Sequence, residues 1–163
     1  MPADSFGLRE QPFGSSVHPG TLIRNRPQQD GLRFLRRMLN DPRGAAWIYG
    51  PRSAGKTSLA LSFLEETQDQ MAVALVDGEG LYASQLLTTI LEQFGYVVSL
   101  SSTNELLNML TVFLVQQARS NDAPLLIVDN VHRMYPGALN VLCRLAGIRV
   151  RDRFALRLVF LSE

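Results

Sequence analysis

The sequence has little cysteine, a single lysine and no long apolar run. Its one cysteine, Cys143, leaves no partner for a disulfide within the chain, so a reducing compartment fits best. Cys143 stands among apolar residues in NVLCRLAG, which predicts a small buried side chain. No apolar stretch approaches the roughly 20 residues that a membrane-spanning helix needs. The start, MPADSFGLREQPFG, has neither the basic end nor the apolar run of a signal peptide, so we expect a soluble, cytoplasmic segment.

Charge of either sign is not in excess. Lys and Arg total 16 against 15 Asp and Glu, which gives a net charge of +1 at pH 7. This balance gives no electrostatic case for a nucleic-acid or membrane-surface protein, although local basic clusters remain open. The sequence has no internal repeat and no low-complexity segment. With 46% hydrophobic residues, residues 1–163 are expected to form one globular domain with its own core.

Two segments precede the main part of this domain. Residues 1–26 are rich in Gly, Pro and Ser and are expected to form an extended arm. Its apolar anchors are Phe6, Leu8 and Phe13. Residues 27–40 are expected to form an amphipathic helix that Asp41 and Pro42 end. One face of this helix carries Leu32, Leu35 and Leu39, and the other carries Arg33, Arg36 and Arg37.

Residues 45–163 are expected to form an α/β core in which four apolar strands alternate with helices. The expected strands are AAWIY (45–49), AVALVD (72–77), PLLIVD (124–129) and ALRLVFL (155–161). The expected helices are TSLALSFLEET (57–67), SQLLTTILEQF (84–94, closed by Gly95), TNELLNMLTVFLVQQAR (103–119, opened by its Thr) and PGALNVLCRLAG (136–147). Strands that are apolar throughout imply burial on both faces, and short connections through helices imply parallel pairing. We predict a three-layer α/β fold around a parallel sheet.

A phosphate-binding loop follows directly after the first strand. The segment GPRSAGKTS matches GxxxxGK[ST] and has the strand, loop and helix context that this motif requires. Glycine lets backbone N–H groups approach a polyphosphate at a helix N-terminus. The candidate nucleotide-binding residues are Gly50, Pro51, Arg52, Ser53, Ala54, Gly55, Lys56, Thr57 and Ser58.

Three side chains of this loop have distinct expected roles. Lys56 reaches the β- and γ-phosphates, the Thr57 hydroxyl ligates Mg²⁺, and Ser58 stays near the α-phosphate. Lys56 is the single lysine beside fifteen arginines, so the chain keeps lysine where a compact ammonium rather than a planar fork is required. The sequence therefore predicts that ATP and Mg²⁺ bind here.

The strand LLIV ends in Asp129 and is followed by Asn130. An aspartate at this place holds Mg²⁺, so Thr57 and Asp129 are the expected metal ligands. Asn130 stands where a carboxylate would accept a proton from the attacking water, whereas an amide can only orient that water. Lys56, Asp129 and Asn130 are thus an expected catalytic set without a base. The strand that ends in LVDGEG is expected beside that of Asp129, so Asp77 or Glu79 could supply the missing carboxylate. Alternatively, both are solvated loop acids.

Four segments carry a resemblance to a known family. FGLREQPFG (6–14), GPRSAGKTS, LLIVDNVH and RLVFLSE resemble AAA+ P-loop ATPases of the general secretion pathway protein A type, which include pilus-biogenesis relatives and related envelope proteins. The resemblance spans nearly the whole chain. It implies an AAA+-like P-loop fold and a cytoplasmic ATPase module, often tethered to the inner membrane, with protein partners in a secretin or pilus assembly.

The same resemblance implies how this chain departs from the family. In Asp129-Asn130-Val131-His132 the metal ligand carries over and the glutamate of the family does not, so slow hydrolysis is expected. Ser162 or Glu163 falls at the position of a polar sensor of the γ-phosphate. The fifth strand and helical lid of the family are not expected in this sequence, which favours a segment of a larger protein.

Three hypotheses for function remain open. The first is an ATP-driven assembly module with ATP-dependent self-association, in which an arginine finger of one subunit contacts the nucleotide of its neighbour. The candidate fingers are Arg149, Arg151 and Arg153. Alternatively, these arginines form only a solvated basic loop. The second is a non-hydrolysing nucleotide-binding scaffold. The third is a helper ATPase for DNA transposition with phosphate contacts from Arg33, Arg36 and Arg37, although nucleic acid is not the expected partner because a charged helix face is usually just solvated.

Overall fold

The computed structural model describes residues 26–41, 44–99 and 101–163. The predicted N-terminal arm, with Phe6, Leu8, Phe13 and the FGLREQPFG segment, lies outside the described residues, and so does Pro42. Among the described residues, no helix has the length and apolar character to cross a membrane.

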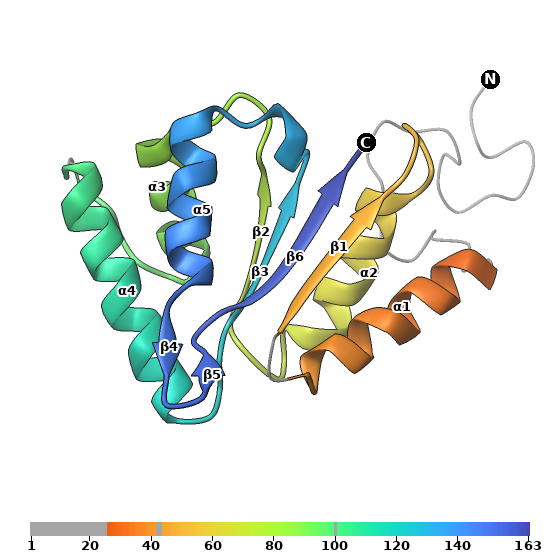
Figure 1. Cartoon of the computed structure of the whole chain (residues 1–163), viewed down its shortest axis with the longest axis horizontal. Helices are drawn as coiled ribbons and strands as arrows, with labels where there is room; N and C mark the ends of the chain where they lie inside the picture. Colours follow the sequence, from red (N-terminus) through yellow and green to blue (C-terminus); the bar gives the residue numbers. More distant parts are fainter. Residues whose placement is uncertain (1–25, 42–43, 100) are drawn as a thin grey trace, which may run out of the picture.

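A parallel sheet with helices between its strands makes up the fold (Figure 1). In chain order the elements are α1 (Arg26–Leu39), β1 (Ala45–Tyr49), α2 (Lys56–Thr67), β2 (Val73–Asp77), α3 (Ala83–Gln93), α4 (Thr103–Arg119), β3 (Leu125–Asp129), the 3₁₀ helix η3 (Val131–Arg133), α5 (Pro136–Ala146), β4 (Arg149–Val150), β5 (Arg153–Phe154) and β6 (Arg157–Ser162). The four long strands run in the order β1-β6-β3-β2, and every neighbouring pair is parallel. The predicted parallel α/β fold is confirmed.

Helices cover both faces of this sheet, which gives three layers (Figure 1). On one face α1 and α2 pack Leu35 and Phe63 against Ile127 of β3. On the other face the helices α3, α4 and α5 bury a larger apolar cluster that includes Leu87 and Val128. Because all neighbouring pairs are parallel, the carboxyl ends of all four strands meet at one edge of the sheet.

Burial differs between the central and the outer strands. All five residues of β3 are buried, as predicted for a strand covered on both faces. The outer strands β1 and β2 instead alternate between more and less buried positions, so continuous burial was wrong for them. Trp47 and Tyr49 of β1 remain 67% and 81% exposed, because β1 lies at the end of the strand order.

Two predictions of buried residues in helices were wrong at single positions, Leu39 of α1 and Cys143 of α5. In α1 the buried residues are Leu32, Leu35 and Met38, and Leu39 is only half-buried. In α5 the buried positions follow helical spacing through Ala138, Val141, Leu142 and Leu145. Cys143 is one residue outside that stripe and is exposed, so the prediction of a buried thiol was wrong. Apolar neighbours in sequence do not bury a residue that the helix turns outward.

Helix α4 begins at the predicted Thr103, and a capping box whose N-cap is Ser102 precedes it. The Ser102 hydroxyl accepts a hydrogen bond from the backbone N–H of Glu105, and the Glu105 carboxylate accepts one from the backbone N–H of Ser102 at 2.7 Å. This backbone bond, followed by the Ser102 hydroxyl, lowers the pKa of Glu105. Two of the N–H groups that a helix start leaves without partners are thereby satisfied.

A short antiparallel hairpin of β4 and β5 precedes β6 and was not predicted. Each of its strands has two residues, and Arg151 in its turn has a φ of 56°. The hairpin lies at the edge of the sheet opposite the carboxyl ends of the strands (Figure 1). Because β4 and β5 take up residues 149–154, β6 begins at Arg157 rather than at the predicted Ala155.

Candidate functional site

The loop of residues 50–55 joins the carboxyl end of β1 to α2, whose first turn carries Lys56, Thr57 and Ser58. The backbone N–H of Gly50 donates to the carbonyl of Ser162, which ties the loop to β6. Gly55 caps α2 with a φ of 83°, a left-handed conformation that glycine adopts without steric cost. The first N–H groups of α2 therefore lie at the carboxyl edge of the sheet, where a helix N-terminus can receive an anion.

Lys56 folds back over this loop. Its ammonium donates to the carbonyl of Gly50 at 2.7 Å and to the carbonyl of Pro51 at 2.8 Å. Both bonds anchor a single compact positive charge at the loop, in the place predicted for the phosphate-binding lysine.

Thr57 and Asp129 meet at the same edge of the sheet. The Thr57 hydroxyl donates to a carboxylate oxygen of Asp129 at 2.6 Å, and the other carboxylate oxygen accepts from the backbone N–H of Asn130 at 2.8 Å. Asp129 is only 7% exposed. Hydroxyl and carboxylate oxygens are ligands that Mg²⁺ prefers, and Mg²⁺ usually takes its remaining ligands from water and phosphate. The pair therefore fits a phosphate-bound Mg²⁺, and within the described ranges no group of three or more His, Cys, Asp or Glu residues offers another metal site.

The side chain of Asn130, which stands where the family has a catalytic glutamate, pairs with Asp77. The two strands align Asp77 with Asp129, as predicted for neighbouring strands. The side-chain amide of Asn130 donates to Asp77 at 3.0 Å, and the backbone N–H of Glu79 donates to the same carboxylate oxygen at 3.1 Å. Asn130 has a φ of 50°, a left-handed conformation that Asn adopts more readily than most residues.

The turn after β2 is joined to the turn after β3 by backbone bonds. Gly78 donates to the carbonyl of Asp129 at 2.8 Å, and Gly80 donates to the carbonyl of Arg133 at 3.2 Å. A Cβ on Gly78 would lie 2.7 Å from Met134 Cγ and 2.9 Å from the Asp129 carbonyl oxygen, so a side chain at this position would displace the turn. Glycine 78 is thus required by close approach of the two turns.

These two turns bring Glu79 against Arg133. The Arg133 guanidinium lies 2.6 Å from the Glu79 carboxylate. Sequence reasoning identified Glu79 as a candidate acid and missed Arg133. In the sequence, Arg133 is marked only by its place four residues after Asp129. The 3₁₀ helix η3 brings it to the cavity.

One polar cavity of about 340 Å³ collects these side chains. Its lining residues are Arg52, Ser53, Gly55, Lys56, Thr57, Ser58, Glu79, Asp129, Asn130, Arg133 and Glu163. Of the two residues predicted at the sensor position, Glu163 lines this cavity, whereas the Ser162 hydroxyl accepts a hydrogen bond from the indole of Trp47 at 2.8 Å. Positive and negative side chains are equal in number here, so an anion and a divalent cation would each meet side chains of opposite charge.

A second cavity of about 550 Å³ adjoins the first and shares Gly55 and Lys56 with it. Phe34 of α1 and Trp47 and Tyr49 of β1 are among its lining residues. This cavity is more apolar, and its aromatic side chains suit a flat ring system.

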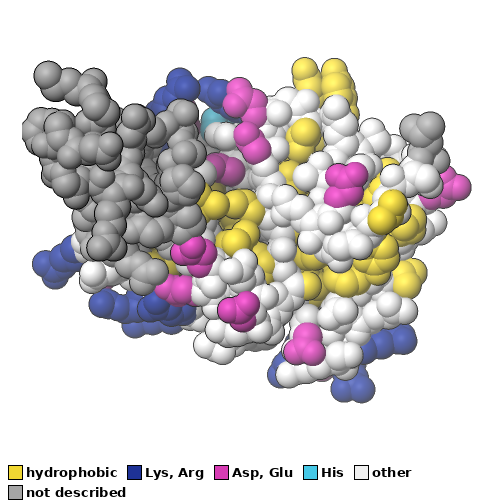
Figure 2. Space-filling model, turned by 180° about the vertical axis from the view of Figure 1, so that it is seen from behind, with side chains coloured by type: hydrophobic (Ala, Val, Ile, Leu, Met, Phe, Trp, Pro, Cys, Tyr) yellow, Lys and Arg dark blue, Asp and Glu magenta, His cyan; other side chains and the backbone are white. Residues whose placement is uncertain are grey.

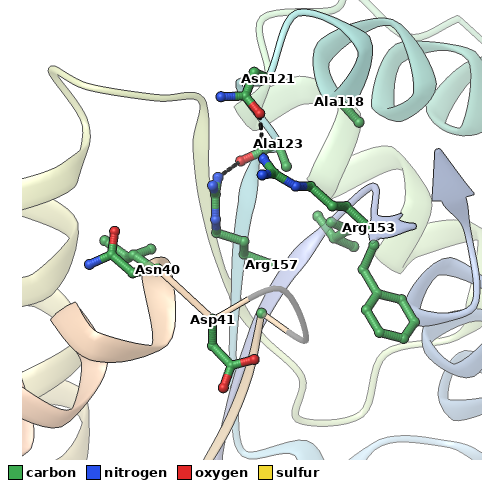
Figure 3. Close-up of a pocket in the computed structure, with 11 residues that line it drawn as sticks. Asn40, Asp41, Ala118, Asn121, Ala123, Arg153 and Arg157 are labelled. Atoms are coloured by element: carbon green, nitrogen blue, oxygen red, sulfur yellow. Dashed lines mark hydrogen bonds between the residues drawn. The ribbon is translucent and has the colours of Figure 1, made fainter. Parts of the chain in front are cut away.

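A third cavity, of about 390 Å³, lies at the opposite edge of the sheet and contains one of the predicted finger arginines (Figure 3). Arg153 donates to the Asn121 side chain at 2.6 Å, and Arg157 donates to the carbonyl of Ala123. Burial, followed by the charge of Arg153, lowers the pKa of Arg157. Arg149 stacks on Phe154 with its guanidinium carbon 4.3 Å from the ring centre. Two of the three candidate fingers therefore contact their own chain, far from its phosphate loop.

The predicted basic face of α1 is largely paired with acids. Arg36 makes two 2.9 Å bonds to Glu66 of α2, and Arg33 lies 3.1 Å from Asp30. In Figure 2, Lys and Arg side chains gather at the lower left, the top and the lower right of the described surface, with separate Asp and Glu side chains between these groups. Arg33 and Arg36 are thus partly neutralised by their neighbours.

Comparison with known proteins identifies similar sequences over nearly the whole chain. A family model for the AAA domain matches residues 29–162. General secretion pathway protein A of Aeromonas hydrophila is 23% identical over 159 residues, which cover 97% of this chain and 29% of that protein. The chain thus spans less than a third of the length of this curated relative.

Solved structures share the same architecture. Cdc6p from Pyrobaculum aerophilum matches with a TM-score of 0.70 at 17% identity, over 93% of this chain and 42% of that one. Drosophila ORC bound to DNA matches with a TM-score of 0.61 at 22% identity, over 85% of this chain and 37% of that one. At these identities the likeness concerns the fold alone, and it confirms the predicted three-layer P-loop architecture.

Proposed function

Because the chain belongs to the AAA domain family, we propose that it is an ATP-binding module that holds Mg-ATP at the phosphate loop and hydrolyses it slowly. The observation that carries this proposal is the 2.6 Å bond between Thr57 and Asp129. It brings the end of β3 to the start of α2, beside the single lysine of the chain. A hydroxyl, a carboxylate and an ammonium then surround one cavity, as a metal-bound triphosphate requires.

Each part of the loop contributes to binding in this proposal. Backbone N–H groups within residues 52–58 surround the phosphates at the N-terminus of α2. Lys56 leaves the loop carbonyls for the β- and γ-phosphates, and Ser58 lies near the α-phosphate. Thr57 and Asp129 hold Mg²⁺, which neutralises phosphate charge. The adjoining apolar cavity, with Trp47 and Tyr49, receives the base.

Slow hydrolysis follows from Asn130. Its amide can orient a water molecule but cannot accept a proton from it. General-base assistance is typically worth about 10² to 10⁴ in rate, so an enzyme without a strong base at this position turns over feebly. Glu163, which lines the cavity, is the better candidate for the sensor of the γ-phosphate.

A role in secretion, pilus or cell-envelope assembly is the wider part of the proposal. Its support is the similarity to general secretion pathway protein A, of which this chain covers 29%. In that role residues 1–163 act as one cytoplasmic nucleotide-binding core of an inner-membrane-associated protein. ATP-dependent self-association and protein partners then belong to the whole protein, and Arg151 is the finger candidate for which no side-chain partner is described.

The test separates binding from turnover. Isothermal titration of Mg-ATP gives the affinity, and phosphate release under saturating Mg-ATP gives the rate. The proposal expects saturable binding that requires Mg²⁺, together with a rate well below the typical 1–10³ s⁻¹ of enzymes. Binding without any phosphate release would favour the alternative of a non-hydrolysing scaffold. A wild-type chain that does not bind Mg-ATP would overturn both.

A second candidate is a DNA-associated ATPase. Its support is the cluster of Arg33, Arg36 and Arg37 on one helix, together with the fold likeness to ORC bound to DNA. Arginines that neutralise phosphates make DNA affinity fall steeply with salt. DNA binding that weakens as salt rises, and that is lost on changing all three arginines to Gln, would favour this candidate over an envelope role.

A further inference from the structure

Arg133 and Glu79 form an ion pair inside the cavity assigned to the triphosphate. Both line it together with Lys56 and Thr57. Their charged atoms lie 2.6 Å apart, although the two side chains are 39% and 53% exposed. An ion pair that is open to solvent stabilises a fold very little, so these two side chains can change partners at small cost.

The backbones that carry this pair are fixed more firmly than the side chains. The N–H of Arg133 donates to the Asn130 carbonyl at 2.9 Å, and the Arg133 carbonyl accepts from Gly80. The rings of Tyr82 and Tyr135, a few residues further along each chain segment, stack with centres 4.4 Å apart. An exchange of partners therefore needs only rotation of side chains, not movement of the two turns.

Arg133 has unused capacity to bind an oxyanion. Its guanidinium uses one nitrogen, Nη1, in the bond to Glu79. A guanidinium presents five N–H donors in a planar fork that fits two oxygens of a phosphate. Two arginines, Arg52 and Arg133, line this cavity together with the proposed Mg²⁺ ligands. Of these two, Arg133 is the one described with an ion pair to an acid of the cavity.

Glu79 is also better placed than Asp77 to act on water. Asp77 already accepts hydrogen bonds from the Asn130 amide and the Glu79 backbone through one oxygen. Glu79 lines the cavity, and its carboxylate is engaged by Arg133. Once Arg133 turns away, this carboxylate is the acid of the cavity that is neither a metal ligand nor at the sensor position.

On these grounds, and resting on the proposed function, we propose that Arg133 exchanges Glu79 for the γ-phosphate of ATP, and that the released Glu79 is the base of the slow hydrolysis. Glu79 accepts a proton from water as the water oxygen bonds to the γ-phosphorus and the bond from that phosphorus to the bridging oxygen breaks. The bridging oxygen leaves with the electron pair as part of ADP, and Glu79 then passes the proton to solvent. With ADP the ion pair stays closed, so Arg133 also distinguishes ATP from ADP.

The experiment measures binding and turnover in matched variants of the whole chain. Affinities for ADP and for a non-hydrolysable ATP analogue, both with Mg²⁺, are determined by titration calorimetry. The variants are Arg133→Gln and Glu79→Gln, with Arg133→Lys as a second variant that keeps the charge without the fork. The controls are Arg144→Gln, an exposed arginine of α5, and Glu66→Gln, a glutamate paired with Arg36 outside the cavity.

Arg133→Gln is expected to weaken binding of the ATP analogue about tenfold or more and to leave ADP binding unchanged, with Arg133→Lys between the two. Glu79→Gln is expected to bind the analogue at least as tightly as the wild type and to lower single-turnover phosphate release about 10²-fold. An unchanged preference for the ATP analogue over ADP in Arg133→Gln, or an unchanged rate in Glu79→Gln, overturns the exchange while the proposed function stands. A wild-type chain that binds neither nucleotide overturns the proposed function, and the exchange with it.

Discussion

The Thr57 hydroxyl and the Asp129 carboxylate are 72 residues apart in sequence and 2.6 Å apart in space. Their bond connects the first helix after the phosphate loop to a central strand of the sheet.

Replacing Asp129 with Asn keeps an acceptor for Thr57 but removes the charge that Mg²⁺ needs. Asp129→Asn should therefore fold normally and bind Mg-ATP about tenfold more weakly or worse. Titration with and without Mg²⁺ measures this, and Asp122→Asn, an exposed loop acid, should bind as the wild type does. Equal Mg²⁺ dependence in Asp129→Asn and the wild type would contradict the assignment.

The bond between Asn130 and Asp77 leads to a prediction about restoring the acid. Asn130→Glu alone places a carboxylate beside that of Asp77 and asks Glu to adopt a left-handed backbone, so part of its gain is lost to repulsion and strain. The double change Asp77→Asn with Asn130→Glu keeps an acid and an amide in contact with their places exchanged. We expect the double variant to turn over ATP faster than Asn130→Glu, and both to exceed the wild type, with a gain of up to about 10² to 10⁴.

Phosphate release at saturating Mg-ATP, with Asp77→Asn as the fourth corner of the cycle, measures this coupling. A double variant whose rate change equals the product of the changes in Asp77→Asn and Asn130→Glu would show that the two positions act independently. That result would remove Asp77 from the account of the site.

Gly78 should tolerate no side chain. A Cβ there meets Met134 and the Asp129 carbonyl at under 3 Å, so Gly78→Ala should lower the free energy of unfolding by about 1–3 kcal/mol and displace the turn that carries Glu79. Gly137→Ala is the matched control, because the space around that glycine is open. Chemical denaturation of both variants gives the comparison. Equal stability of the two would mean that the turns after β2 and β3 are not as closely packed as described.

The capping box of α4 should make stability depend on pH. The pKa of Glu105 is lowered by its bonds to Ser102, so the folded state favours the ionised form more than the unfolded state does. This contribution is present above the ordinary carboxyl pKa of 4.5 and is lost as pH falls through the lowered value.

Glu105→Gln should therefore lose stability relative to the wild type at pH 7 and differ less from it at acid pH. Glu92→Gln, on the exposed side of α3, should show a smaller difference that does not follow this course. Parallel pH dependence of Glu105→Gln and the wild type would contradict the role of the box.

Sequence patterns were sufficient for the fold wherever a signal extended over a whole element. Four apolar segments were identified as strands, and all four are strands of one parallel sheet. The glycine-rich loop was located because its motif is local and occurs between a strand and a helix. Asp77 was placed beside Asp129 because parallel neighbours end at one edge.

Features that depend on packing between distant segments were missed. Arg133 joins the site only because Gly78 lets two turns approach closely, and no periodicity in the sequence encodes that approach. Cys143 is exposed because α5 turns its apolar stripe one residue away. The two-residue strands β4 and β5 are too short for any alternation to be read. The prediction that residues 1–163 form one domain stays a prediction, since the N-terminal arm lies outside the described residues.

Thermal unfolding with and without Mg-ATP tests the central claim most directly, which is that residues 50–58 and Asp129 form a nucleotide site. A ligand that binds only the folded state at about a hundred times its dissociation constant adds about 2.7 kcal/mol of stability. The account predicts that millimolar Mg-ATP raises the melting temperature of the wild type, and that Lys56→Ala unfolds at a similar temperature to the wild type without nucleotide but shows little or no shift with it. An unshifted melt in the wild type and in Lys56→Ala alike, at millimolar Mg-ATP, would contradict the account.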